Sequence, residues 1–234
     1  MSEAALQTEF DFSEEEIALL LDNIDDYTFD EVVEIDKMVN ELANRKANQL
    51  AFDDLIAFCQ AMMPEFIVGK HHRILADMLM AIERGDKDRV CVNVPPRHGK
   101  SQVVSIFYPA WFLGRNPDKK VMMVSHTTDL AVDFGRKVRN LIATDDYGAI
   151  FPSVKLAQDS KSAGRWNTNV GGEYYACGVG SSIAGRGADL LLIDDPHSEQ
   201  DVINGNFSAF VRAYDWYTFG ARTRLMPGGR VAIV

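Results

Sequence analysis

The residues of this chain best suited to chemistry are a Gly-Lys-Ser triplet at positions 99–101 and a pair of aspartates at 194–195. The triplet closes the run PPRHGKS, which follows the apolar stretch VCVNV and precedes a helical pattern. A strand, a loop and a helix in this order form the context of a phosphate-binding loop, whose backbone N–H groups surround an anion. We therefore expect a nucleotide-binding loop made of Pro96, Arg97, His98, Gly99, Lys100, Ser101 and Gln102.

Each residue of the triplet has a chemical role in such a loop. Lys100 would reach the β and γ phosphates, and the Ser101 hydroxyl would bind Mg²⁺. Gly99 would let the backbone approach the anion closely. The full pattern GxxxxGK[ST] requires glycine at position 94, where this chain has Val94. A chance Gly-Lys-Ser in a surface turn is therefore the alternative interpretation.

The aspartate pair follows four apolar residues in the run DLLLIDD. Ligands of open α/β sheets bind at the carboxyl ends of the strands, where these two side chains are expected. Asp194 would hold Mg²⁺, and Asp195 would polarise the attacking water. Asp-Asp-Pro is also good turn chemistry, and Asp195 is one methylene shorter than the glutamate usual in such ATPases. No Asn/Thr-Lys-x-Asp base reader accompanies the pair, so ATP is the expected nucleotide.

Phosphoryl transfer also needs positive charge near the transferred oxygens, which arginine commonly supplies. Arg97 lies inside the loop, and Arg186 lies between glycines in the run SIAGRG. Both are candidates for this role, and each could equally close a surface turn.

The pattern of apolar residues predicts the elements that position these side chains. Buried strands are expected at 90–94, 121–124, 190–193 and 231–234, with helices at 101–113 and 129–142 between them. RWNT and EYYACGV flank Asn-Val-Gly-Gly, which predicts an inserted β-hairpin. Further helices are expected after a cap at Ser13, at 52–63 and at 71–84. The fold class is thus α/β, a P-loop NTPase of the RecA-like type with a mainly parallel sheet flanked by helices, plus an N-terminal helical segment.

Charge divides the chain in two. The total is −10, yet residues 1–60 carry 16 acidic and 3 basic side chains, a net of −13, which leaves 18 acidic and 21 basic side chains, a net of +3, for the rest. We expect an acidic helical segment at 1–60 and the P-loop ATPase domain at 61–234. DNA binding needs clustered basic residues. One candidate face, which ordinary solvated helix charges would also explain, contains Lys119, Lys120, Arg136, Lys137 and Arg139.

Composition excludes several other classes of protein. No uncharged apolar stretch approaches the roughly 20 residues that cross a bilayer, and the acidic first residues do not resemble a secretory signal. A soluble intracellular protein without a membrane is expected. Cys59, Cys91 and Cys177 lack the spacing of a zinc site or disulfide framework, so we expect three reduced thiols in or near the core.

Four stretches together resemble the large terminase subunits of tailed bacteriophages, whose N-terminal half is a DNA-packaging ATPase. They are VNVPPRHGKSQVVSIFYPAWFLGRNP, RWNTNVGGEYYACGVG, SSIAGRGADLLLIDDP and GARTRLMPGGRVAIV, and they cover most of residues 66–234. A loop that contains arginine and lacks its first glycine is usual in that family. The family's coupling motif and RNase H-like nuclease are absent from this sequence, so the resemblance extends to the ATPase half.

The resemblance implies roles for the arginines and a place for the base. Arg97 would sense the γ-phosphate in its own subunit, and Arg186 would enter the next subunit's site. Phe66 and His71 would lie near the adenine. The implied cofactors are ATP and Mg²⁺. The implied partners are double-stranded viral DNA, a portal protein, a small terminase subunit and further copies in a ring on the portal, in the cytoplasm of an infected host.

Two other functions fit the same residues. A helicase or chromatin-type translocase shares the sheet and both motifs, the phosphate-binding loop and the aspartate pair. A nucleotide-binding assembly module, in which ATP holds subunits together and turnover is incidental, is an alternative from another class of function.

Overall fold

The computed structural model describes residues 14–23, 26–158 and 162–234. The chain forms two compact units, Met1–Leu50 and Ala51–Val234, each considered by itself. The charge distribution predicts a boundary at residue 60, whereas the structure divides earlier. The reason is the helix Leu55–Met62, in which Leu55, Ile56 and Phe58 are buried in the core of the second unit.

The first unit is helical, as the apolar periodicity predicts. It contains α1 (Glu14–Asp22) and most of α2 (Phe29–Asp53). Thr28 caps α2, because its N–H and its hydroxyl both donate to the Glu31 carboxylate at 2.7 Å. Arg45 and Glu41 form an ion pair one turn apart. The predicted cap at Ser13 lies outside the described residues.

The second unit alternates strands and helices along most of its length. Its strands are β1 (Arg89–Cys91), β2 (Lys120–Ser125), β3 (Arg165–Asn167), β4 (Glu173–Gly178), β5 (Ala188–Ile193) and β6 (Leu225–Ile233). Its helices are α3 (Leu55–Met62), α4 (Lys70–Arg84), α5 (Tyr108–Arg115), α6 (Thr128–Ile142), α7 (Asp145–Ile150), α8 (Glu199–Ile203) and α9 (Phe207–Asp215). Two π-helical turns, η3 (Gln102–Phe107) and η4 (Trp216–Ala221), and a 3₁₀ turn, η5 (Arg222–Arg224), complete it.

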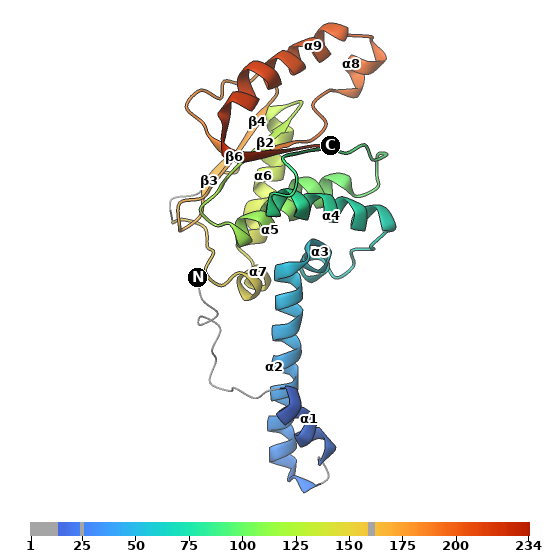
Figure 1. Cartoon of the computed structure of the whole chain (residues 1–234), viewed down its shortest axis with the longest axis vertical. Helices are drawn as coiled ribbons and strands as arrows, with labels where there is room; N and C mark the ends of the chain where they lie inside the picture. The colour runs from blue at the N-terminus through green and yellow to red at the C-terminus, as the bar shows by residue number, and fades with distance from the viewer. Residues whose placement is uncertain (1–13, 24–25, 159–161) are drawn as a thin grey trace. The chain divides into compact units, whose positions relative to one another are not determined.

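The six strands form one sheet in the order β1-β6-β5-β2-β4-β3. All neighbouring pairs are parallel except β3 with β4, so the sheet is mainly parallel. In Figure 1 the strands cross the middle of the unit, with α9 on one side of them and both α4 and α5 on the other. The apolar runs VMMV and LLLI lie in the two central strands and are buried throughout, as expected for strands covered on both faces.

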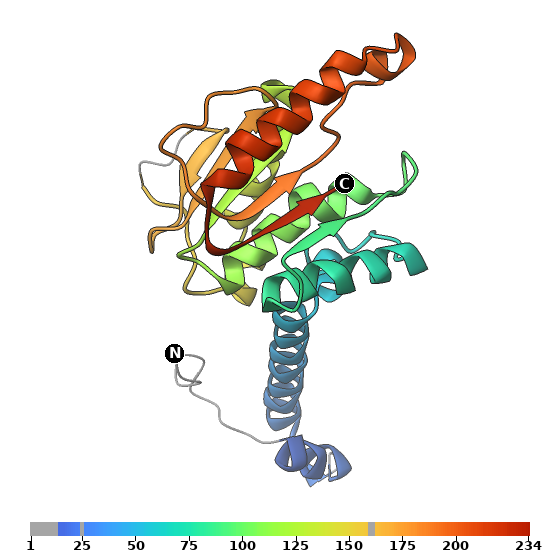
Figure 2. The same cartoon turned by 45° about the horizontal axis from the view of Figure 1, so that its top comes forward.

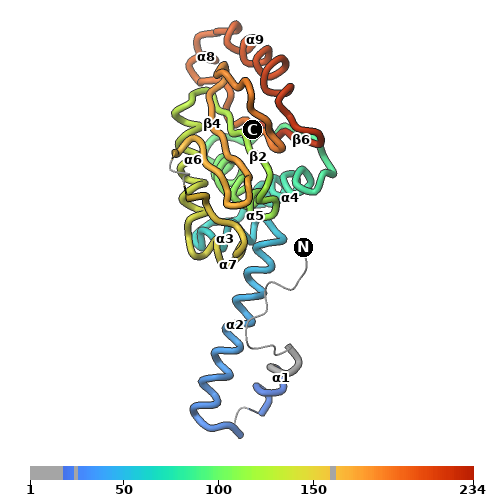
Figure 3. Tube along the Cα trace, turned by 90° about the vertical axis from the view of Figure 1, so that its left-hand side faces the viewer, coloured from blue at the N-terminus to red at the C-terminus, as the bar shows by residue number. Residues whose placement is uncertain are grey.

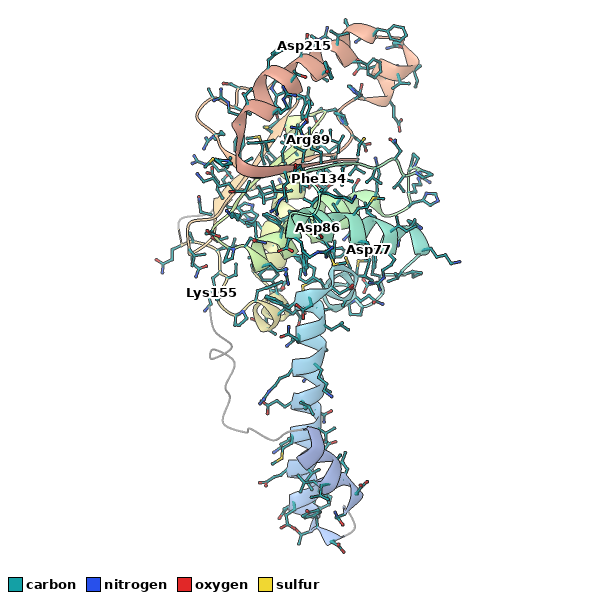
Figure 4. All side chains as sticks on the ribbon, in the orientation of Figure 1. Asp77, Asp86, Arg89, Phe134, Lys155 and Asp215 are labelled. Carbon is teal, nitrogen blue, oxygen red and sulfur yellow. The ribbon has the colours of Figure 1, made fainter. Side chains whose placement is uncertain are left out.

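Alternate residues of β5 face two separate cores. Leu190 and Leu192 belong to the larger core with α3 to α7, which also contains Phe134 of α6, labelled in Figure 4. Leu191 and Ile193 belong to the smaller core under α9 and η4. Figures 2 and 3 show α9 covering one face of the sheet, with α5 and α6 on the other. This alternation decides which side chains at the end of β5 can meet.

Most predicted elements are confirmed, with three corrections. The strand expected at 90–94 ends at Cys91. The hairpin is no insertion, because β4 pairs in parallel with β2 over its full length and so belongs to the central sheet. The helices α7, α8 and α9 are not among the predicted elements, and their short, interrupted apolar pattern explains the omission.

Candidate functional site

The loop between β1 and the following helix has the backbone of an anion-binding concavity. Residues 92–99 connect the strand to a helix that starts at Lys100. Arg97 and Gly99 both have left-handed φ angles, 63° and 72°. A left-handed residue within a tight turn directs successive N–H groups toward one point, where they can bind an anion. Any residue with a side chain would be strained at position 99, because its φ angle is positive.

The helix after the loop contains an irregular turn with an identifiable cause. Pro109 has no N–H to donate to the carbonyl of Ser105, and its ring would clash there. The helix accommodates this by widening into the π-helical turn η3, from Gln102 to Phe107, directly before α5. Ser105 lies inside this turn and is fully buried.

Asp194 lies at the carboxyl end of β5 and faces the helix that follows the loop. It continues the side of Leu190 and Leu192, and Ser105 donates a hydrogen bond to its Oδ2 at 2.6 Å. Its side chain is 2% exposed and lies 3.8 Å from Lys100 Nζ. Burial raises the pKa of Asp194, while hydrogen bonds from Ser105 and Ser101 oppose that rise. The Ser101 contact places the predicted second metal ligand beside the first.

Asp195 reaches the same lysine, although neighbours on a strand normally point to opposite faces. Its φ of 45° is left-handed and breaks that alternation. Lys100 Nζ therefore lies 2.5 Å from Asp195 Oδ1, across 95 positions of sequence. A non-glycine residue held in this region marks stored strain, which concentrates at functional sites.

One oxygen of the buried Asp194 carboxylate has no hydrogen-bond partner. Asp194 Oδ1 and the hydroxyl of Ser125 are both buried and unpartnered among the described side chains. The register Val124↔Ile193 continues to Ser125 and Asp194, so these groups are neighbours on adjacent strands. The free oxygen of Asp194 lies next to the hydroxyls of Ser101 and Ser125. Such oxygen ligands suit Mg²⁺ and its water shell. The residues present therefore fit the expected metal.

His126 also belongs to this edge of the sheet and was missed by sequence reasoning. Its backbone N–H donates to Asp195 O at 3.1 Å, and its ring Nδ1 is buried with no hydrogen-bond partner in the described part of the chain. The available signal was its position directly after the predicted strand at 121–124, at the edge where ligands of parallel sheets bind.

The two candidate arginines lie in different places. Arg97 is exposed on the loop, with no ion pair or hydrogen bond to the described residues. Arg186 precedes β5, so at about 3.3 Å per residue it is roughly 20 Å from the aspartates, at the opposite end of the strand. There its guanidinium contacts Glu173 at 3.2 Å and stacks over Tyr175. The structure does not bring Arg186 together with Lys100.

The remaining residues predicted to contact the nucleotide lie in the loop or near it. Phe66 is buried, and its ring packs on His72 and Phe107, which leaves little of its surface for an adenine. His71 Nε2 lies 3.1 Å from the carbonyl oxygen of His98. The rest of the loop makes local contacts: His98 bonds through Nδ1 to the carbonyl of Pro96, and the amide of Gln102 points at Met63 Sδ.

Three of the five residues of the expected basic face form ion pairs. Arg136 and Lys137 both pair with Asp133 on α6, and Lys119 pairs with Asp189. These are ordinary helix and strand charges, so this surface supplies no argument for DNA contact.

The cysteines are free, as expected. Cys59 and Cys177 are buried as expected, whereas Cys91 is exposed, contrary to the expectation of three thiols in or near the core. No helix among the described residues is long and apolar enough to cross a membrane.

An apolar pocket lies on the other face of the sheet from Lys100. It has a volume of about 190 Å³, and Ile193, Ile233 and Trp216 are among its lining residues. These belong to the smaller core, whereas Asp194 continues the larger one. The pocket is therefore separate from the site that contains Lys100.

The chain is thus an α/β protein with a mainly parallel sheet, and its loop, lysine and paired acids form a candidate ligand site at the strand ends. The chain belongs to the large terminase subunits. Residues 91–219 match the family described as "Terminase large subunit, T4likevirus-type, N-terminal", which is more than half of the chain.

Solved structures include a similar chain. The large terminase of bacteriophage HK97, known from a crystal structure, is 12% identical, with a TM-score of 0.49 over 78% of this chain. The alignment covers 37% of that protein, so this chain corresponds to only part of its length. No curated protein sequence matches.

Proposed function

We propose that this chain is the ATPase part of a viral DNA-packaging motor, which binds Mg-ATP between the loop and the end of β5 and hydrolyses it. The observation that carries the proposal is the meeting of Lys100 with both aspartates, at 2.5 Å and 3.8 Å. Membership in the large terminase subunits supports DNA packaging as the process that ATP hydrolysis drives. The order β1-β6-β5, with one strand between the loop strand and the acid strand, supports the RecA-like P-loop class.

The protein's own residues divide the work of hydrolysis. Backbone N–H groups of the loop and the Lys100 ammonium bind the phosphates. Ser101 and Asp194 hold Mg²⁺, which neutralises charge on the phosphate oxygens when bound. Asp195 exchanges its ion pair with Lys100 for a water molecule, which it orients and polarises. Asp195 is suited to that exchange because its side chain is 53% exposed, unlike that of Asp194.

The arginines supply further positive charge from two directions. Arg97, which has no partner among the described side chains, acts on the γ-phosphate of its own subunit. Arg186 lies too far from Lys100 to act within one chain, and its distance supports a role in the site of a neighbouring subunit. A ring on the portal, with viral DNA and a small terminase subunit as partners in the infected cytoplasm, provides that neighbour.

The test is nucleotide binding and turnover in three variants. Calorimetry with Mg-ATP should show binding by the wild-type chain and none by Lys100→Ala. Asp195→Asn should still bind, because asparagine tolerates left-handed backbone, and should lose about 100-fold or more of the turnover. Lys137→Ala removes an exposed lysine that pairs with Asp133 of α6 and is the matched control. Absence of wild-type binding would refute the proposal. Turnover that survives both Asp195→Asn and Arg186→Ala would favour the assembly module.

A further inference from the structure

His71 and His72, at the start of α4, both contact the backbone of the candidate phosphate-binding loop. His72 is 7% exposed, and its ring packs against Phe66 with centroids 4.9 Å apart. The N–H of Gly69 donates to His72 Nδ1 at 3.0 Å. His72 Nε2 lies 2.9 Å from the carbonyl oxygen of His98, at the tip of the loop.

These contacts define the protonation state of His72. Because Nδ1 accepts a hydrogen bond, the proton of the neutral ring is on Nε2, which donates to the carbonyl of His98. Burial lowers the pKa of His72 and so favours this neutral form. His71 adds a second ring nitrogen at 3.1 Å from the same oxygen, and the two rings lie 3.9 Å apart.

The carbonyl of His98 determines the direction of the next N–H group. The peptide between His98 and Gly99 is planar and trans, so its C=O and N–H point in opposite directions. A carbonyl held toward α4 therefore turns the Gly99 N–H away from α4, toward the concave side of the loop. Accepting hydrogen bonds also polarises the peptide and makes that N–H a stronger donor.

Without this support the peptide has an alternative orientation. Gly99 has a φ of 72°, and glycine occupies either sign of φ with little difference in energy. A rotation of the peptide would point the carbonyl oxygen into the concavity and repel an anion. The fit is close, because a Cβ at position 99 would lie 2.6 Å from His72 Nε2.

We propose that His72, assisted by His71, is a positioning residue that fixes the peptide between His98 and Gly99 so that the Gly99 N–H faces the phosphates. The inference rests on the proposed function for its consequence in nucleotide binding. The orientation of the peptide itself belongs to the free protein and can be tested there.

The test compares two substitutions of His72. His72→Leu removes the donor and keeps an apolar side chain, whereas His72→Gln can return a donor to the position of Nε2. Tyr147→Phe is the matched control, since it also deletes one buried side-chain hydrogen bond to a backbone carbonyl, that of Ala110, in another part of the core. Each variant is titrated with Mg-ADP and with pyrophosphate, and the Gly99 amide is followed by NMR after ¹⁵N-glycine labelling.

We expect His72→Leu to weaken both ligands by about 5- to 10-fold, the value of one net hydrogen bond. His72→Gln should recover most of this affinity, and Tyr147→Phe should bind as the wild type does. The Gly99 resonance should shift or broaden in free His72→Leu only. Wild-type affinity in His72→Leu, or an unchanged Gly99 resonance, would overturn the proposal.

The two failures are distinguishable. If the wild-type chain binds neither ligand, the proposed ATPase function fails. In that case a Gly99 resonance that changes in His72→Leu and returns in His72→Gln would still support the role of His72.

Discussion

The hydrogen bond between Ser105 and Asp194 offers a direct measure of how the buried carboxylate is stabilised. Ser105→Ala removes the hydroxyl that donates to Asp194 Oδ2 at 2.6 Å. A hydrogen bond to a charged group contributes about 1.5–3 kcal/mol, and here the acceptor would remain buried. The second unit, residues 51–234, should therefore lose about 2 kcal/mol, or roughly 4–8 °C in Tm.

Ser125→Ala is the control, because it also removes a buried serine hydroxyl, but one that does not donate to Asp194. Ser125 is also fully buried and lies beside Asp194 on the neighbouring strand, and its hydroxyl has no hydrogen-bond partner among the described residues. Removing an unpartnered buried hydroxyl is neutral or stabilising. Its Tm should thus rise or stay within about 2 °C of the wild type.

Thermal unfolding followed by tryptophan fluorescence is a suitable assay, since all three tryptophans lie in the second unit. The Ser105→Ala penalty should also depend on pH. Burial raises the pKa of Asp194, so ionisation costs stability as the pH rises through that pKa, and the Ser105 bond offsets part of this cost. The penalty should therefore be larger at pH 8 than at pH 4. Equal losses in the two alanine variants, or a penalty that grows as the pH falls, would refute the reasoning.

Two further predictions concern residues away from Lys100. Burial raises the pKa of the Cys177 thiol to about 11 and raises that of Cys59 further, whereas Cys91 is exposed. Ellman's reagent should therefore modify one thiol quickly in the folded protein and all three after unfolding, and two fast thiols would contradict the structure. Glu173→Gln should loosen both Arg186 and Arg165, which contact the same carboxylate at 3.2 and 2.9 Å, at a cost below about 1 kcal/mol for each partly exposed pair. If Arg186 serves a neighbouring subunit, ATPase activity in the assembled ring should be kept or increased, and a loss as large as that of Arg186→Ala would contradict that role.

The sequence predicts the framework of this site well and its details poorly. The strands at 121–124 and 190–193 and the helix at 129–142 follow from uninterrupted periodicity, because burial on two faces or one leaves a simple pattern. The approach of Lys100 to the aspartates follows from the rule that ligands bind at strand ends.

The details depend on backbone irregularities that a periodic pattern does not encode. The left-handed φ of Asp195 brings both carboxylates to one lysine, whereas regular alternation would separate them. Ser105 faces Asp194 from within a π-helical turn, and Pro109 in the helical pattern was the signal available for it. His72 could not be assigned from sequence because its partner, the His98 carbonyl, is a backbone atom 26 positions away.

The position of β6 has a consequence for how this molecule folds. The strand that carries the loop and the strand that carries the acids are not neighbours, and β6, the latest of the six in the chain, lies between them. Before β6 docks, Lys100 and Asp194 belong to two fragments with no shared ladder of hydrogen bonds. Such late, long-range pairing is slow. A growing chain should therefore acquire its helices and the β2–β5 pair first, and bring Lys100 and Asp194 together only once β6 has paired.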